Sequence, residues 1–113
     1  MIKYIVCATR KPGISHEEFS AYWSERHGPL VRSVPEFSRY VRKYVQCHLV
    51  KGSAPLGSGG SYDGVAELWF DSVEDLHKAF SEPRYLEIIR PDEQKFVDGE
   101  RFLSFITEEI EFI

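Results

Sequence analysis

The sequence predicts an α+β fold in which one antiparallel sheet carries helices on one face. Segments with strand-like composition and segments with helical periodicity follow one another in the order strand, helix, strand, strand, helix, strand. This order is typical of the ferredoxin-like βαββαβ arrangement. The chain has 113 residues, enough for one such unit and too few for two, so residues 1–113 are expected to form a single domain.

The first strand and helix are marked by composition and by capping residues. Residues 2–10 are rich in β-branched and aromatic side chains and contain no breaker, which predicts a strand. Ser15 and Glu18 have the spacing of a capping box, so a helix should begin there. The pair Gly28-Pro29 is expected to end this helix, with Gly28 in the left-handed conformation and a short helical piece continuing to about Val34.

One face of this helix is apolar and aromatic. Phe19, Trp23 and Leu30 follow a helical period and should pack against the sheet. Arg26 falls on the same face. Either its long side chain reaches solvent at the helix end, which is the simpler interpretation, or it binds an anionic group of a ligand.

A second strand is expected at residues 39–50, where the side chains alternate between two sides. One side is apolar and predicts a core face: Val41, Val45, Cys47 and Leu49. The opposite side is polar and aromatic and should face water or line a cavity: Tyr40, Arg42, Tyr44, Gln46 and His48. The Gly- and Ser-rich residues 51–61 predict a loop, either a lid over a pocket or a tolerated insertion.

The second half of the chain repeats the pattern. Residues 62–70 predict a third strand, in which Glu67 has apolar neighbours on its own face and must be paired or have a raised pKa if it is buried. A helix should begin at Ser72, a further helical piece at Pro83, and a last strand should span residues 103–113.

Apolar side chains on both faces of several strands indicate that the face without helices is also covered. A homodimer formed through that open sheet face is the simplest solution, and two such sheets would make an α/β barrel. In the usual strand order the third strand separates the first two. Cys7 and Cys47 would then lie roughly 9–10 Å apart, beyond disulfide reach.

Composition limits the classes of partner. The net charge of −4 comes from interspersed signs without a basic stripe, which argues against nucleic acid and membrane surfaces and favours a small-molecule ligand. No signal peptide or membrane-spanning run is visible, so a cytoplasmic location is expected. Histidines at short ligand spacing and Cys-x-x-Cys motifs are absent from the sequence, so we expect no metal and no other cofactor.

His27 is the strongest candidate for chemistry, because an imidazole can accept and donate a proton near neutral pH. The alternative is a histidine that caps its own helix end. Asp92 could orient His27 or simply begin a helix after Pro91. His48 is a weaker candidate, whereas His16 and His77 are expected to be solvated.

Four aromatic residues could line a flat pocket, although each taken singly is more typical of a core: Tyr22, Trp23, Tyr40 and Tyr44. The candidate catalytic residues are therefore His27, Asp92 and Tyr22. The candidate substrate-binding residues are Trp23, Tyr40, Tyr44, Glu67 and Arg26.

Several motifs together resemble the EthD family of dimeric α/β barrel proteins. They are Arg10-Lys-Pro-Gly, Ser15-His-Glu-Glu-Phe, Tyr22-Trp23, His27-Gly-Pro-Leu30 and Asp63-Gly-Val-Ala-Glu-Leu-Trp-Phe70. The resemblance implies a ligand pocket between sheet and helices, with polar positions at His27, Asp63, Glu67 and Asp92. The family name comes from an ether-degradation operon. Related barrels include cofactor-free oxygenases and cyclases, isomerases and haem-handling enzymes.

The resemblance implies two kinds of function. The first is a cofactor-free enzyme, such as an oxygenase, isomerase or cyclase, in which His27 moves a proton on an aromatic, phenolic, enolic or lactone substrate. The second is a non-catalytic binding or accessory protein of a degradation pathway. A haem-binding barrel, with His27 or His48 as axial ligand, is a further alternative.

Overall fold

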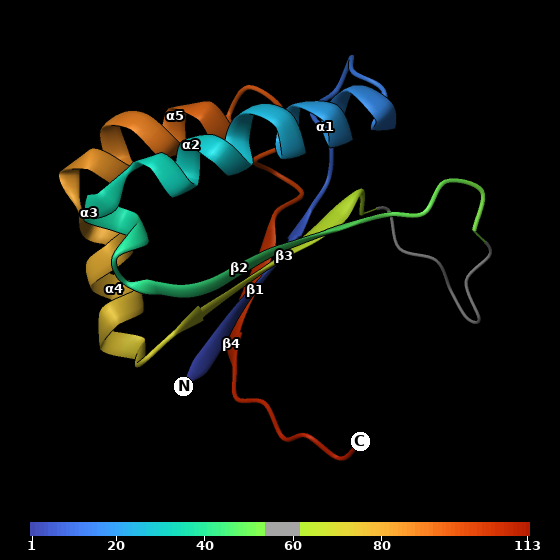
Figure 1. Ribbon diagram of the computed structural model, residues 1–113. Coiled ribbons are helices and arrows are strands. Elements are labelled where there is room, and N and C mark those ends of the chain that lie inside the picture. Colours follow the sequence, from blue (N-terminus) through green and yellow to red (C-terminus); the bar gives the residue numbers. More distant parts are fainter. Residues whose placement is uncertain (54–61) are drawn as a thin grey trace.

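A computed structural model describes residues 1–53 and 62–113 and confirms the predicted α+β architecture. Four antiparallel strands form one sheet in the order β2-β3-β1-β4. Figure 1 shows the helices on one face of this sheet and the other face uncovered. The strands are β1 (Ile2–Ala8), β2 (Val41–His48), β3 (Gly64–Phe70) and β4 (Leu103–Thr107). The helical elements are α1 (His16–Tyr22), η1 (Trp23–His27), α2 (Gly28–Ser33), α3 (Pro35–Ser38), α4 (Val73–Ser81), η2 (Tyr85–Ile89) and α5 (Arg90–Glu93).

The strand order explains why the two cysteines stay reduced. Cys7 of β1 and Cys47 of β2 both pair with Val65 of β3, so β3 separates them as predicted. Both cysteines are free thiols. The separation of about two strand spacings exceeds the reach of a disulfide.

The apolar side of β2 is not the core face that was predicted, and the polar side faces the helices, as expected for residues that help to line a cavity. Gln46 donates a hydrogen bond to the carbonyl oxygen of Trp23 at 2.9 Å, and the ring of His48 lies 4.6 Å from that of Trp23, so this polar side faces the helices. Val45 and Cys47 alternate with them and lie on the open face. The polar side chains can face inward because they find hydrogen-bond partners there.

The first helix begins as predicted and continues past the residues that were expected to end it. The hydroxyl of Ser15 accepts from the Glu18 amide at 3.0 Å, and Glu18 accepts from the Ser15 amide at 3.2 Å, which completes the capping box. Gly28 has φ −56°, an ordinary right-handed value, so the predicted left-handed stop is wrong. Glycine serves close packing here, since a Cβ at this position would lie 3.0 Å from Nε2 of Gln46.

Two of the helical segments contain a π-turn, and in both the second residue after the turn is a proline. In η1 the amide of Gly28 donates to the carbonyl of Trp23, five residues back, and Pro29 follows. In η2 the amide of Arg90 donates to the carbonyl of Tyr85, and a proline again follows. Because proline has no amide hydrogen, the regular hydrogen-bond pattern of the helix is interrupted at the same point in each segment.

The π-turn in η1 moves the inner face of the helix by one residue. An α-helix has 3.6 residues per turn, so Arg26, His27 and Leu30 would all lie near the face of Trp23. The wider turn centres that face on His27 and Val31, which are 6% exposed, while Arg26 is exposed to solvent. The simpler interpretation of Arg26 as a solvated side chain therefore holds.

The last strand is shorter than the predicted range of residues 103–113. β4 ends at Thr107, and the residues after it form no regular element. Glu109 of this C-terminal segment accepts a hydrogen bond from the indole of Trp69. Further along, Ile110, Phe112 and Ile113 are largely exposed.

Candidate active site

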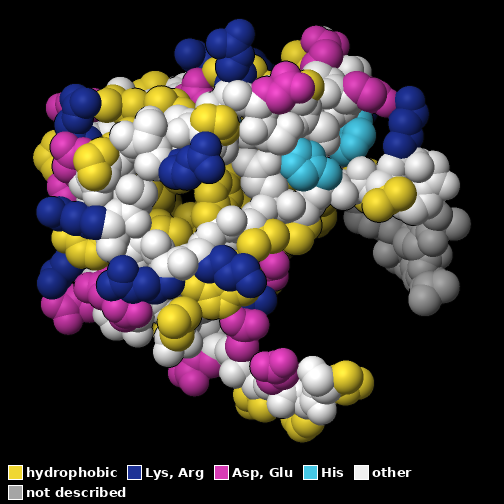
Figure 2. All heavy atoms as spheres, in the orientation of Figure 1, with side chains coloured by type: hydrophobic (Ala, Val, Ile, Leu, Met, Phe, Trp, Pro, Cys, Tyr) yellow, Lys and Arg dark blue, Asp and Glu magenta, His cyan; other side chains and the backbone are white. Residues whose placement is uncertain are grey.

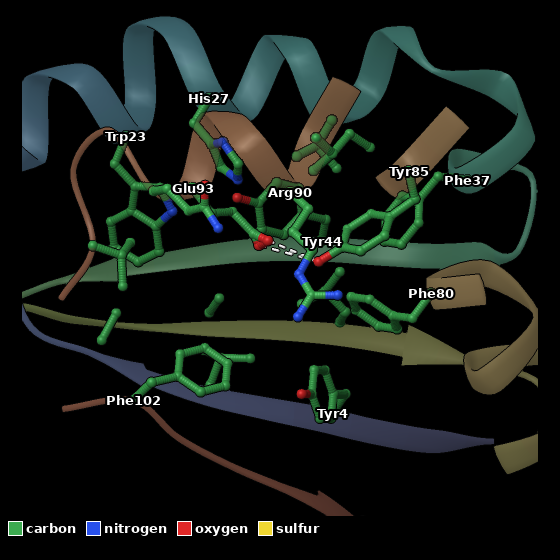
Figure 3. A pocket seen from close by; sticks show the side chains of 18 of the residues that line it. Tyr4, Trp23, His27, Phe37, Tyr44, Phe80, Tyr85, Arg90, Glu93 and Phe102 are labelled. Carbon is green, nitrogen blue, oxygen red and sulfur yellow. Dashed lines mark hydrogen bonds between the residues drawn. The ribbon is translucent and has the colours of Figure 1, made fainter. Parts of the chain in front are cut away.

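A cavity of about 750 Å³ lies between the helices and the covered face of the sheet. Figure 2 shows it as a hollow with hydrophobic walls. Its size is within the range of small-molecule binding sites. Its lining includes eight aromatic side chains: Tyr4, Trp23, Phe37, Tyr44, Phe80, Tyr85, Phe96 and Phe102. Figure 3 labels all of them except Phe96. Figure 3 also shows the polar groups His27, Glu93 and Arg90 at the cavity.

His27 is held by a carboxylate behind it. Its Nδ1 lies 2.9 Å from Oδ2 of Asp92, and the hydroxyl of Tyr22 donates to Oδ1 of the same carboxylate at 2.5 Å. Lys95 adds a cation 3.5 Å from Oδ1. His27 is 6% exposed and Asp92 is 7% exposed. The two π-turn segments η1–α2 and η2–α5 thus meet through this pair.

The directions in which the pKa values of His27 and Asp92 are shifted indicate where the protons of this pair lie. Burial alone would raise the pKa of the Asp92 carboxyl, but the hydrogen bonds from Tyr22 and His27 outweigh it and lower that pKa, so Asp92 is a carboxylate at neutral pH. Burial lowers the pKa of His27, with Asp92 acting in the opposite direction. The neutral ring must donate from Nδ1 to the carboxylate, which leaves the lone pair on Nε2.

Glu93 is a second titratable group in the cavity, and the sequence analysis missed it. The hydroxyl of Tyr85 donates to its two carboxyl oxygens at 2.7 and 3.2 Å, as the dashed lines in Figure 3 show. Burial raises the pKa of Glu93 to about 7, and burial also raises that of Tyr85. Tyr85, Ile89 and Glu93 have the same spacing as Trp23, His27 and Val31, with a proline between the second and third residue of each set, and this was the available signal.

The Glu93 carboxyl should make the protein less stable as the pH rises. The folded protein keeps this proton up to a pKa of about 7, whereas the unfolded chain releases it near 4.5. The free energy of unfolding therefore falls by roughly 1.4 kcal/mol per pH unit between these two pKa values, which gives about 3 kcal/mol in total. Above the higher value it no longer changes through this group. Urea unfolding from pH 4.5 to 7.5 measures the slope, with Glu93→Gln as control. Parallel curves for the two proteins would contradict the prediction.

Tyr44 lines the cavity and carries a hydroxyl group that accepts a hydrogen bond from a neighbouring side chain. Its oxygen accepts from Nε2 of Gln46 at 2.9 Å, and the carbonyl side of that amide lies 2.9 Å from Nε2 of His48. Nδ1 of His48 lies 2.8 Å from the hydroxyl of Ser20, which ends the chain of bonds. Burial raises the pKa of Tyr44, so its hydroxyl stays protonated and can donate to a molecule in the cavity.

The predicted site residues fall into three groups. Trp23, Tyr44 and His27 line the cavity, while Asp92 and Tyr22 lie behind His27. Tyr40 lies outside the lining and packs beneath the guanidinium of Arg39, 5.0 Å from the ring centre. Arg26 is exposed on the outer face.

Glu67 is placed on the wrong side of the sheet to line the cavity. It pairs with Ile5 of β1 and Val45 of β2, whose side chains lie on the open face, and it forms an ion pair of 3.0 Å with Lys3. Alternation along β3 causes this, because Leu68 faces the helices and its neighbour must face away. Glu67 therefore does not line this cavity, and the prediction that it binds a ligand there is wrong.

Asp63 and His16 form a structural cluster at another end of the sheet. Asp63 is 2% exposed and accepts from the Arg10 amide at 2.7 Å and from the Arg10 guanidinium at 2.8 Å. Nδ1 of His16 lies 2.8 Å from the same carboxylate, so the expectation that His16 is solvated is wrong. The exposed His77 borders the cavity. Most of the predicted loop at residues 51–61 lies outside the described residues.

Among residues 1–53 and 62–113, no cluster of three or more His, Cys, Asp or Glu side chains could hold a metal ion. Within the same ranges no helix has the length and apolar character needed to cross a membrane.

Residues 11–100 match the family description of the EthD domain. A conidial pigment biosynthesis dehydratase of Metarhizium robertsii is 34% identical over 105 residues, covering 85% of this chain and 73% of that protein. Among solved structures, an EthD family protein of Bacillus halodurans has a TM-score of 0.70 at 22% identity and covers 97% of this chain and 100% of its own. A dimeric ferredoxin-like protein of Bacteroides fragilis has a TM-score of 0.68 at 13% identity, with coverage of 96% and 95%.

Proposed function

The chain belongs to the EthD family, and from this premise we propose that it is a cofactor-free dehydratase of an aromatic, partly saturated ketone that carries a hydroxyl group β to the carbonyl. The relative named as a pigment biosynthesis dehydratase supports loss of water rather than the ether degradation associated with the family name. The cavity supports a ligand of this class, because its walls are mainly aromatic and apolar.

One observation carries the proposal. His27 has one nitrogen bonded to the Asp92 carboxylate at 2.9 Å while its ring borders an apolar cavity. A neutral imidazole held in this way is a general base whose tautomer and orientation are fixed. Its Nε2 can take the proton from the carbon next to the ketone, and the Asp92 carboxylate stabilises the imidazolium that forms.

Tyr44 completes the proposed binding of the ketone. Removal of the proton places negative charge on the carbonyl oxygen, and a donor aimed at this oxygen stabilises the enolate. The hydroxyl of Tyr44 can donate because its oxygen already accepts from Gln46. The hydroxyl group on the next carbon then leaves as water.

A simple bicyclic ketone tests the proposal. With 3-hydroxy-1-tetralone, loss of water followed by tautomerisation gives 1-naphthol, whose fluorescence reports turnover. We expect saturable turnover by the wild-type protein, unchanged by a chelator. Quenching of tryptophan fluorescence without release of 1-naphthol would favour the non-catalytic binding protein and overturn the enzyme.

We also infer that a second copy of the chain covers the open sheet face. This face carries aliphatic and aromatic side chains. Leu103 is 48% exposed and Phe105 is 45% exposed. The dimeric relative of the same fold supports a second copy as the partner.

Charge at the centre of the open face should separate the dimer. Val65 lies on the central strand β3 between Cys7 and Cys47, so Val65→Lys would place an ammonium group in the apolar contact. We expect sedimentation to give a dimer for the wild type and a monomer for this variant. Leu86→Lys, at a residue 42% exposed on η2, is the matched control and should remain dimeric. A monomeric wild type would contradict the inference.

A further inference from the structure

Asp92 and Glu93 are neighbours in the chain, but their carboxyl groups lie in different surroundings and have different hydrogen-bond partners. Asp92 bonds to His27 and Tyr22 and lies 3.5 Å from the ammonium group of Lys95. Glu93 lines the cavity, where Figure 3 shows its carboxyl group hydrogen-bonded to the hydroxyl of Tyr85. The ion pairs among the described residues include Asp92 but not Glu93. Burial in an apolar chamber favours the neutral form of a carboxyl group, whereas a hydrogen bond donated by a phenol favours the carboxylate.

The charged and titratable groups around Glu93 come from three elements. Tyr85 reaches it from η2, Arg90 and Asp92 act from its own helix, and Tyr44 lies across the cavity on β2. The negative charge of Asp92 acts in the same direction as burial, while Arg90 and the Tyr85 hydrogen bond act against them. The balance gives Glu93 a pKa of about 7, so a large fraction carries a proton at neutral pH.

The proposed dehydration needs a proton that the resting His27 ring does not carry on Nε2. The neutral ring has its only proton on Nδ1, where Asp92 accepts it, so Nε2 can act only as a base at the start of the reaction. Hydroxide is a poor leaving group and departs readily only when it is protonated as it leaves. A second group in the same cavity that already carries a proton can supply it while His27 acts as the base.

We propose that Glu93 is the general acid of this site and protonates the departing hydroxyl group while His27 takes a proton from the adjacent carbon. The proposal rests on the dehydration proposed above. It assigns acid and base to two different helical segments, each next to a π-turn and each directed into one cavity. Tyr85 positions the carboxyl group through its hydrogen bond at 2.7 Å.

The step balances in protons and electrons. The C–H bond breaks, its proton goes to Nε2 of His27, and its electron pair forms the enolate. The enolate pair forms the new C=C bond as the C–O bond breaks, and the oxygen receives the Glu93 proton and leaves as water. Transfer of one proton from the imidazolium to the Glu93 carboxylate, directly or through solvent, restores both groups. No oxidant, reductant or metal takes part.

A change of leaving group tests the assignment. Acetate needs no proton to depart, so 3-acetoxy-1-tetralone requires the base but not the acid. We expect Glu93→Gln to lower kcat for 3-hydroxy-1-tetralone by about 10²-fold or more and to change it less than about threefold for the acetoxy compound. His27→Ala should lose activity on both. The hydroxy probe alone should show a fall in activity above about pH 7.

Each alternative outcome is distinguishable. Equal losses on both probes would make Glu93 a positioning residue, and no loss on either would remove it from the reaction; both results overturn the proposal. Failure of the wild type on both probes would overturn the dehydratase itself, and the acid with it. Circular dichroism and thermal unfolding of Glu93→Gln ensure that the comparison uses folded protein. Tyr85→Phe, which keeps the ring, should show a smaller loss on the hydroxy probe only.

Discussion

Replacing His27 by alanine should lower kcat for 3-hydroxy-1-tetralone by about 10³-fold, since a positioned general base contributes roughly 10²- to 10⁴-fold. Binding should change little, because the apolar walls supply most of the contact and His27 is one of many lining residues. Steady-state kinetics give kcat, and quenching of tryptophan fluorescence by 1-naphthol gives Kd. We expect the Kd of His27→Ala for 1-naphthol to agree with that of the wild type within about threefold.

Two further variants locate the effect. Asp92→Asn keeps the shape of the side chain but removes the charge behind the imidazole at 2.9 Å, and should cost about 10²-fold in kcat through a misoriented ring. Arg26→Ala changes the exposed neighbour of His27 on the same helix and should be neutral. Full activity in His27→Ala would remove this residue from the site, and a large loss in Arg26→Ala would show that the effect is not local.

Gly64→Ala should lower the free energy of unfolding by about 3 kcal/mol, the upper part of the usual range for overpacking. A Cβ at this position would lie 2.4 Å from Cζ3 of Trp23 and 2.9 Å from the carbonyl oxygen of Cys47. The backbone of β2 cannot yield easily, and the indole is 4% exposed within the core. Displacing it would also move the cavity wall that Trp23 forms.

Urea unfolding followed by circular dichroism measures this loss. Gly99→Ala is the matched control, because nothing lies within 4 Å of a Cβ there. Gly28→Ala should fall between the two, since its clash at 3.0 Å is with the flexible end of Gln46. A midpoint for Gly64→Ala equal to that of Gly99→Ala would contradict the prediction.

The sequence was sufficient for the architecture because strands and helix starts have local signals. The Ser15 capping box and the alternation of residues 62–70 depend on nearest neighbours in the chain, and both predictions hold in outline. The inward side of β2 was misjudged because burial was inferred from side-chain type. Gln46 and His48 are polar but have partners on the first helix, a contact between segments that no local pattern contains.

The site was half predictable. The helix stripe placed His27 near aromatic residues, but an α-helical period also places Arg26 near that face and does not show that only His27 is buried. As a single acidic residue, Glu93 gave no signal beyond the spacing that it shares with Val31. Its raised pKa comes from an apolar chamber whose walls are assembled from distant strands and helices.

The paired π-turns have a consequence for the history of the family. An α-helix with one residue fewer between Trp23 and His27 would present the same side chains inward, so each π-turn has the geometry of a single-residue insertion that the helix absorbed. Relatives can therefore differ in length at these two points and still keep the same groups in the cavity. Homologous imidazole and carboxyl groups should be matched by their place on the cavity wall, with a one-residue gap allowed before each proline.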